Sequence, residues 1–321
     1  MANKKHSKKI VGVAPGGLPN PASPVAKRYL CHFPDPSRDL PSAFVDSVQK
    51  LEKTIGLPVW LLIQGGGEEW DILGDMVVSA LRTARKMGLQ RGQRVALLID
   101  SRGGLARIAY EIAMLFRRHC GGFIAIVPRI AKSAATLLAL GADEIILGEY
   151  GELGPLDVQV LDPEREERIS GLDEVHSLER LNAFAMTALD KAMILFANRT
   201  GMKAKTLLPH VSRFVADLTG PLFGHIDVVH YTQMSRALKE GEEYARRLLR
   251  RQYGTDDANA IARQLVENYP EHGFIIDQDE AKTLGMRLKE PTADQLRIMD
   301  DIVEHLDGLT AIGRITERKI P

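Results

Sequence analysis

The stretch of residues 94–159 most constrains how this chain can fold, because it repeats a short apolar run that ends in small residues. Two such runs, at residues 94–100 and 122–127, lead to a Gly-Gly pair at 103–104 and to a small-residue segment around Ser133. Continuous apolar runs of this length are typical of strands that are buried on both faces of a parallel sheet. Functional groups in such sheets gather at the carboxyl ends of the strands. The stretch therefore predicts an α/β fold with a site at these two turns.

The same pattern begins earlier in the chain, with an apolar run at residues 58–64 that stops at three glycines. Apolar residues then recur at helical spacing up to Gly88. A further helical stripe runs through residues 181–196, and the chain beyond it reads as mainly helical. Strand, turn and helix thus alternate through the first half, and helices dominate the second.

Composition divides the chain into four predicted segments. Residues 1–40 combine Lys, Gly, Pro and Ser, a composition that cannot bury a core, so we expect a flexible N-terminal arm. Residues 41–200 hold the predicted α/β core, and residues 201–308 are expected to form a helical C-terminal extension. Residues 309–321 are expected to be a tail.

Three motifs follow one another in the central stretch. They read Asp100-Ser-Arg-Gly-Gly104, Ala131-Lys-Ser-Ala-Ala-Thr136 and Leu153-Gly-Pro-Leu-Asp-Val-Gln159. In this order they resemble the serine dehydrogenase proteinase family, which belongs with the prokaryotic signal-peptide-peptidase-like serine peptidases of S49 type. The resemblance is dense over residues 58–159 and resumes at 272–277. It implies a Clp/crotonase-like spiral of ββα units with additional C-terminal helices.

Ser133 is the candidate nucleophile. It follows an apolar run interrupted by Pro128 and begins an apolar helical segment, where backbone N–H groups can stabilise developing negative charge. A serine at this position is also a common helix N-cap, and the residues alone leave both roles open. The resemblance favours the nucleophile.

The resemblance also implies an oxyanion hole, formed by backbone N–H groups that hold the substrate carbonyl oxygen as it gains charge. Carried onto this sequence, the donors are Gly104, with Gly103 beside it, and Ala134. A glycine pair suits this role because glycine adopts backbone conformations that other residues avoid.

The third motif is expected to contribute to substrate binding. By the resemblance, Leu153, Gly154 and Pro155 form part of the substrate channel near the nucleophile. An extended peptide can pair its backbone with a free strand edge in such a channel.

The general base is the open part of the site. The loop that would carry a Clp-type histidine contains none, whereas signal-peptide-peptidase-like members use a lysine, which needs a depressed pKa to act as a base. Lys191 is the lysine that best fits, because its Lys-Ala-Met context is similar to that of the family and it borders the apolar stripe. Lys132, His176 and His272 remain as alternatives.

Charge and cysteine content limit the kinds of molecule that this protein is expected to bind. Lys and Arg number 42 and Asp and Glu number 42, so net charge does not indicate a nucleic-acid partner. The two cysteines lack metal-ligand spacing, and we predict neither a metal nor another cofactor. No apolar run approaches the roughly 18 residues of a membrane helix, so no integral membrane segment is expected and the protein is predicted to be cytoplasmic.

The sequence thus predicts a serine endopeptidase that cleaves peptides, or unfolded or membrane-derived protein segments, through a Ser-Lys dyad and a backbone oxyanion hole. A homo-oligomer is expected. Two alternatives stay open, because one fold serves several chemistries: a crotonase-like enzyme that processes acyl-coenzyme A, and a non-catalytic oligomeric scaffold with a peptidase fold.

Overall fold

The fold is centred on a five-stranded sheet with the strand order β10-β2-β3-β4-β6. A computed structural model describes residues 27–31, 39–65, 73–89, 91–162 and 167–319. Four strands run parallel, and β10 joins one edge antiparallel to β2. The strands are β2 (Val59–Gln64), β3 (Val95–Asp100), β4 (Phe123–Val127), β6 (Glu144–Leu147) and β10 (Thr310–Gly313).

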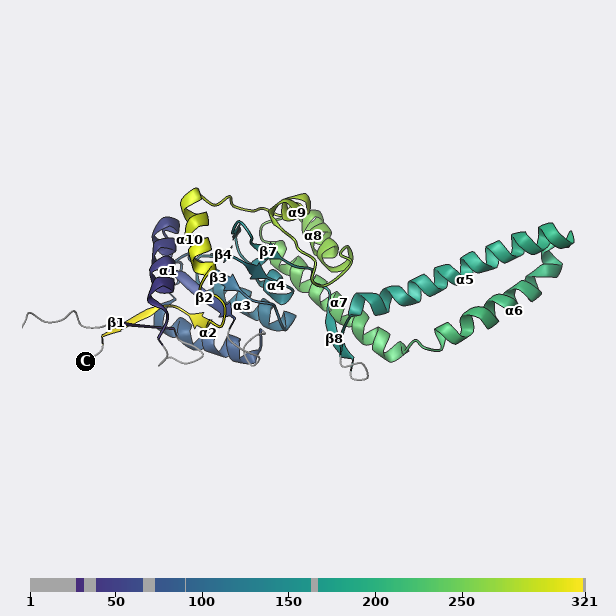
Figure 1. Ribbon diagram of the computed structural model, residues 1–321, viewed down its shortest axis with the longest axis horizontal. Helices are drawn as coiled ribbons and strands as arrows, with labels where there is room; N and C mark the ends of the chain where they lie inside the picture. Colours follow the sequence, from purple (N-terminus) through teal and green to yellow (C-terminus); the bar gives the residue numbers. More distant parts are fainter. Residues whose placement is uncertain (1–26, 32–38, 66–72, 90, 163–166, 320–321) are drawn as a thin grey trace, which may run out of the picture.

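Helices cover both faces of this sheet, which explains why its strands are apolar throughout (Figure 1). All residues of β2, β3 and β4 are buried. Alternate side chains of β2 enter the two opposite cores, Trp60 on one face and Leu61 on the other. One face packs against α2 (Asp75–Gly88), α3 (Ala106–His119), α4 (Ala134–Ala139), α7 (Val228–Leu249) and α8 (Thr255–Glu267), and the other against α1 (Ser42–Ile55) and α10 (Ala293–Val303).

Short elements complete the core and frame the site. β5 (Ile130–Ala131) pairs in parallel with β7 (Glu152–Leu153), just beyond the carboxyl end of β4. The short helix α9 (Gln278–Thr283) follows the loop that contains His272. Two further strand pairs are β8 (Gln159–Asp162) with β9 (Glu167–Ser170), and β1 (Lys27–Leu30) with β11 (Thr316–Lys319).

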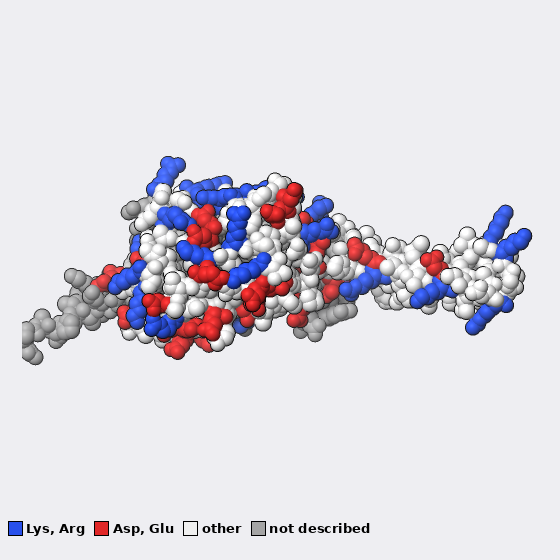
Figure 2. Space-filling view, turned by 90° about the horizontal axis from the view of Figure 1, so that it is seen from above, with Lys and Arg blue, Asp and Glu red and all other residues white. Residues whose placement is uncertain are grey.

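Two long helices leave the core as a projecting hairpin, which we call the arm (Figure 1). It consists of α5 (Gly171–Thr200) and α6 (Ala204–Phe223), joined at Gly201, whose φ of 67° suits glycine. A small cluster that includes Ala192 and Val211 holds the two helices together. Figure 2 shows that the arm is largely uncharged along its length, with Lys and Arg side chains at its far end.

The sequence correctly predicted the α/β class and the mostly parallel sheet, but the segment boundaries need correction. Helices beyond residue 200 do not form a separate extension, because α7, α8 and α10 pack into the two cores. The expected tail at 309–321 includes β10, whose Ala311 and Ile312 are fully buried beside β2. Most of the expected N-terminal arm at 1–40 lies outside the described residues.

Candidate active site

Ser133 has the one positive φ of a non-glycine residue within the described parts of the chain. Its φ is 51° and its ψ is −122°, at the turn between β5 and α4. Such a backbone conformation costs about 1–3 kcal/mol and persists where the surrounding structure imposes it, often at functional sites. Ser133 occupies the N-cap position of α4, and its carbonyl oxygen accepts the Leu137 N–H at 3.1 Å, but its side chain does not cap the helix. Its backbone is therefore strained, and its hydroxyl is not used as a helix cap.

The glycine turn that follows β3 lies directly against Ser133. Gly103 and Gly104 have φ values of 109° and 143°, which residues with side chains rarely adopt. A Cβ on Gly103 would lie 2.8 Å from the Cβ of Ser133, and one on Gly104 would lie 2.3 Å from the backbone nitrogen of Leu73. Both positions therefore require glycine, for space as well as for conformation.

Hydrogen bonding separates the roles of these two glycines. The Gly103 N–H donates to Ser101 Oγ at 3.1 Å and is thereby occupied. Leu73 pairs with the residues on either side of Gly104, so the Gly104 N–H points away from Leu73. Among the residues that the structure describes, no acceptor pairs with the N–H of Gly104 or of Ala134. Of the three N–H groups predicted for an oxyanion hole, those of Gly104 and Ala134 are thus open to a further acceptor, whereas that of Gly103 is already bonded to Ser101.

A histidine-carboxylate pair lines the same cavity. His272 Nδ1 lies 2.7 Å from Asp157 Oδ1, and the Asp157 side chain is only 5% exposed. Its other oxygen, Oδ2, accepts a hydrogen bond of 2.9 Å from Ser170 Oγ. A carboxylate on Nδ1 leaves Nε2 as the free ring nitrogen, which is the arrangement that a general base requires.

Backbone pairing brings these distant segments together. Leu153 and Ile276 exchange two backbone hydrogen bonds, of 2.9 and 3.1 Å, and the Leu156 N–H donates to Leu265 O. The first segment carries Asp157 and the second carries His272. Their register therefore fixes the pair relative to the core.

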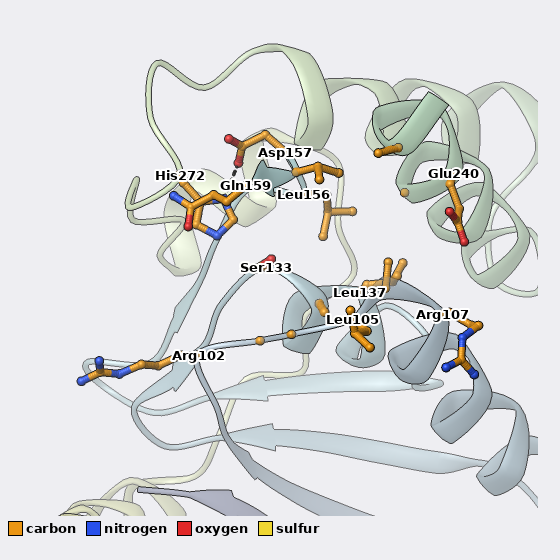
Figure 3. A pocket seen from close by; sticks show the side chains of 17 residues that line it. Arg102, Leu105, Arg107, Ser133, Leu137, Leu156, Asp157, Gln159, Glu240 and His272 are labelled. Carbon is orange, nitrogen blue, oxygen red and sulfur yellow. Dashed lines mark hydrogen bonds and ion pairs between the residues drawn. The ribbon is translucent and has the colours of Figure 1, made fainter. Parts of the chain in front are cut away.

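The cavity has a volume of about 780 Å³. Figure 3 shows His272 and Asp157 on the wall that faces Ser133. The cavity continues between α3 and α7, where its lining is partly apolar, so it offers room for a substrate side chain beside the nucleophile. Lining residues in this part are Leu105, Arg107, Leu137, Leu156, Ala237 and Glu240.

Lys132, one of the alternative bases, acts as a structural tie. Its Nζ lies 2.7 Å from Glu152 Oε2 and donates to the backbone oxygens of Leu153, at 3.0 Å, and Phe274, at 3.5 Å. These partners belong to the two segments that carry Asp157 and His272. The Lys132 side chain thus ties these two segments together, and it does not line the cavity that contains Ser133.

The structure does not bring Lys191 to Ser133. Lys191 is exposed on α5, in the arm, and does not line the cavity. His176 lies on the same helix and also outside the cavity. Among the four predicted candidates for the base, His272 alone lines the cavity with Ser133.

The predicted substrate residues Leu153, Gly154 and Pro155 are buried and do not line the cavity, unlike the residues that follow them. The Gly154 N–H donates to Thr136 Oγ1 at 2.9 Å, and a Cβ on Gly154 would lie 2.9 Å from Lys132 Cδ. This part of the motif therefore packs behind the wall of the cavity, and Leu156 and Asp157, which follow it, line the cavity.

Comparison with known proteins identifies part of the chain. Residues 54–172 match the family model of the ClpP-like SDH-type serine proteinases, which confirms the resemblance over this segment. The segment includes Ser133, the glycine turn and Asp157, whereas His272 lies beyond it. Among described residues, no helix has the length and apolar character needed to cross a bilayer.

Two uncharacterized proteins of Methanocaldococcus jannaschii are similar to this chain. One is 26% identical over 231 residues, which are 72% of this chain and 62% of the relative. The other is 25% identical over 194 residues, which are 60% of this chain and 51% of the relative. The chain thus spans about half to three fifths of the length of these relatives.

Proposed function

Because residues 54–172 match the ClpP-like SDH-type serine proteinases, we propose that this protein is a serine endopeptidase with Ser133 as nucleophile, His272 as general base and Asp157 as the residue that orients His272. The observation that carries the proposal is the 2.7 Å contact of Asp157 with His272 in the wall of the cavity that faces Ser133. This assignment replaces the Ser-Lys dyad expected from the sequence.

The proposed reaction begins when Ser133 Oγ attacks the carbonyl carbon of a peptide bond and His272 Nε2 takes its proton. Asp157 accepts the Nδ1–H and stabilises the imidazolium that forms. The carbonyl oxygen gains negative charge and accepts hydrogen bonds from the N–H groups of Gly104 and Ala134. The imidazolium then protonates the leaving amine, and water, activated by the same histidine, hydrolyses the acyl-enzyme.

Exposed apolar side chains support a second part of the proposal, a homo-oligomer assembled through the arm. Residues such as Phe184, Ile194 and Phe214 are 47%, 62% and 52% exposed. Fully buried side chains of this size contribute roughly 150–250 Å² each. The half-exposed set on the arm therefore presents several hundred Å², on the scale of the ~800 Å² that each partner buries in a stable interface. The set comprises Phe184, Met186, Ile194, Leu195, Phe196, Met202, Leu208, Phe214, Leu218 and Leu222.

Labelling with a fluorophosphonate probe tests the catalytic residues. We expect a single adduct by intact-protein mass spectrometry on the wild type and none on Ser133→Ala. His272→Ala should slow peptide hydrolysis by about 10⁶-fold, because the base is lost. His176→Ala serves as the matched control, since it removes a histidine outside the cavity.

Lys191→Ala separates this assignment from the Ser-Lys dyad. We expect the variant to label and cleave at the wild-type rate. Loss of activity in Lys191→Ala together with an active His272→Ala would overturn the triad. A folded wild type that forms no adduct would favour the scaffold, and binding of a coenzyme A thioester without acylation of Ser133 would favour acyl-coenzyme A chemistry.

Oligomer mass tests the arm. Analytical ultracentrifugation should show an assembly for the wild type and a smaller species for the double variant Phe184→Ser, Phe214→Ser. A monomeric wild type would remove this part of the proposal and leave the catalytic part untouched.

A further inference from the structure

Two buried polar side chains lie behind the glycine turn, and the proposed reaction does not use them. Ser101 and Gln64 are 1% and 3% exposed, at the carboxyl ends of β3 and β2. The Ser101 hydroxyl donates to Gln64 Oε1 at 2.6 Å and accepts the Gly103 N–H at 3.1 Å. A polar pair in such a dry position is expensive to bury unless its hydrogen bonds are made.

Ser101 also fixes the strand that leads to the nucleophile. Its N–H donates to Ile130 O at 3.0 Å, and its own carbonyl oxygen accepts the Lys132 N–H at 3.0 Å. One residue therefore binds the glycine turn through its side chain and the segment before Ser133 through its backbone. The two halves of the oxyanion hole, at Gly104 and Ala134, meet at this residue.

The Ser101 hydroxyl binds the Gly103 N–H and so leaves the Gly104 N–H available to the substrate. A hydroxyl has one proton, and because that proton goes to Gln64, the oxygen lone pairs are free to hold the Gly103 N–H. Glycine torsions themselves offer little resistance to rotation, so hydrogen bonds hold this turn: the Leu73 N–H donates to Gly103 O at 2.7 Å, and the Gly103 N–H donates to Ser101 Oγ. Without the hydroxyl, the Gly103 N–H would be buried without an acceptor, and the turn would relieve this by rotating, which re-aims the Gly104 N–H.

We propose that Ser101 and Gln64 are positioning residues that hold the glycine turn so that the Gly104 N–H, and not the Gly103 N–H, serves as an oxyanion donor. The inference rests on the proposed function. The pair touches neither substrate nor the reacting atoms and acts only through the backbone of the turn.

Ser101→Ala tests the inference through a split between kcat and KM. Complete loss of an oxyanion donor lowers the rate by about 10²–10³-fold. Misaiming the donor should lower kcat by roughly tenfold to a hundredfold and change KM by less than about twofold, because the donor acts mainly in the transition state. A peptide boronate, which mimics the tetrahedral state, should lose affinity by the same factor. Ser101→Thr keeps the hydroxyl and should restore most of kcat.

Ser47→Ala is the matched control. Ser47 is another buried serine, 5% exposed, on α1 in the opposite core. Its removal tests the loss of a buried hydroxyl without touching the turn, so kcat should stay unchanged. A Ser101→Ala enzyme whose kcat matches that of Ser47→Ala would overturn the inference, as would a change confined to KM.

A double-mutant cycle tests whether the two residues act together. Gln64→Met removes the acceptor at similar side-chain length, and combined with Ser101→Ala it should lower kcat no further than either change alone. Fully additive losses would contradict a shared role. The wild-type labelling experiment separates the two levels: an unlabelled wild type refutes the peptidase, whereas a labelled wild type with an equally fast Ser101→Ala refutes only the positioning role.

Discussion

The core and the arm of this molecule differ in how they treat their large apolar side chains. Core side chains such as Trp60 and Phe116 are fully buried between sheet and helices, whereas Phe184 and Phe214 on the arm are about half exposed. The core thus satisfies its apolar surface within one chain, and the arm does not. The difference teaches that the candidate site lies in the part of the chain that buries its own apolar surface, while the arm leaves apolar side chains exposed.

The largest expected difference between the two regions is in stability. Phe116→Ala removes a buried ring that packs against Trp60 and Phe123, and should lower the free energy of unfolding by about 3–5 kcal/mol. Phe214→Ala, the same change on the arm, should alter it by no more than about 0.5 kcal/mol at a protein concentration low enough to leave the arm unassembled. Urea unfolding monitored by circular dichroism measures both. Equal losses would mean that the arm is as integral to folding as the core.

The reactivity of Cys120, which is buried in the core, measures how well the core excludes water. Burial raises the pKa of this thiol from its ordinary value of 9.0 to about 11. Since a raised pKa favours the neutral thiol, the thiolate fraction at pH 8 falls by about a hundredfold in the folded protein. Iodoacetamide should therefore modify Cys120 about a hundredfold more slowly in buffer than in urea, as followed by peptide mass mapping. Similar rates in both solvents would show that water reaches this side of the core.

The arm and the core are not fully separate, because a residue at the base of the arm contacts the candidate site. Ser170, the N-cap of α5, donates to Asp157. Ser170→Ala should lower kcat by about tenfold, the effect of losing one hydrogen bond to a charged group, without dissociating the arm. Ser177→Ala is the control, since that hydroxyl lies on the same helix and bonds only its own backbone, at Asp173 O. If both variants keep full activity, the arm and the site are independent.

The local pattern of apolar residues was sufficient to predict three strands of the sheet. The runs at residues 58–64, 94–100 and 122–127 match β2, β3 and β4 closely, because strands buried on both faces leave a continuous apolar signal bounded by turns. β10 was not predicted, because four residues are too few to show a clear apolar pattern. Its place in the sheet depends on pairing with β2, which is distant in sequence.

The candidate site was predicted in part. Ser133 and the glycine turn lie within one motif-bearing stretch, so sequence order was enough to associate them. The pairing of Asp157 with His272 depends on a tertiary contact between distant segments, and no spacing rule reveals it. Lys191 was favoured by its Lys-Ala-Met context and by its place beside the apolar stripe of one helix, and neither local signal can show that α5 leaves the core (Figure 1).

The long separation between Ser133 and His272 along the chain also sets an order of events during synthesis. Ribosomes make proteins from the N-terminus, and segments begin to fold as they emerge. Ser133 and the glycine turn are therefore complete before the arm has been made, while His272 and the strand β10 that closes the sheet come after it. Under the proposed assignment, the general base is therefore added only after the surface proposed for assembly has already been made.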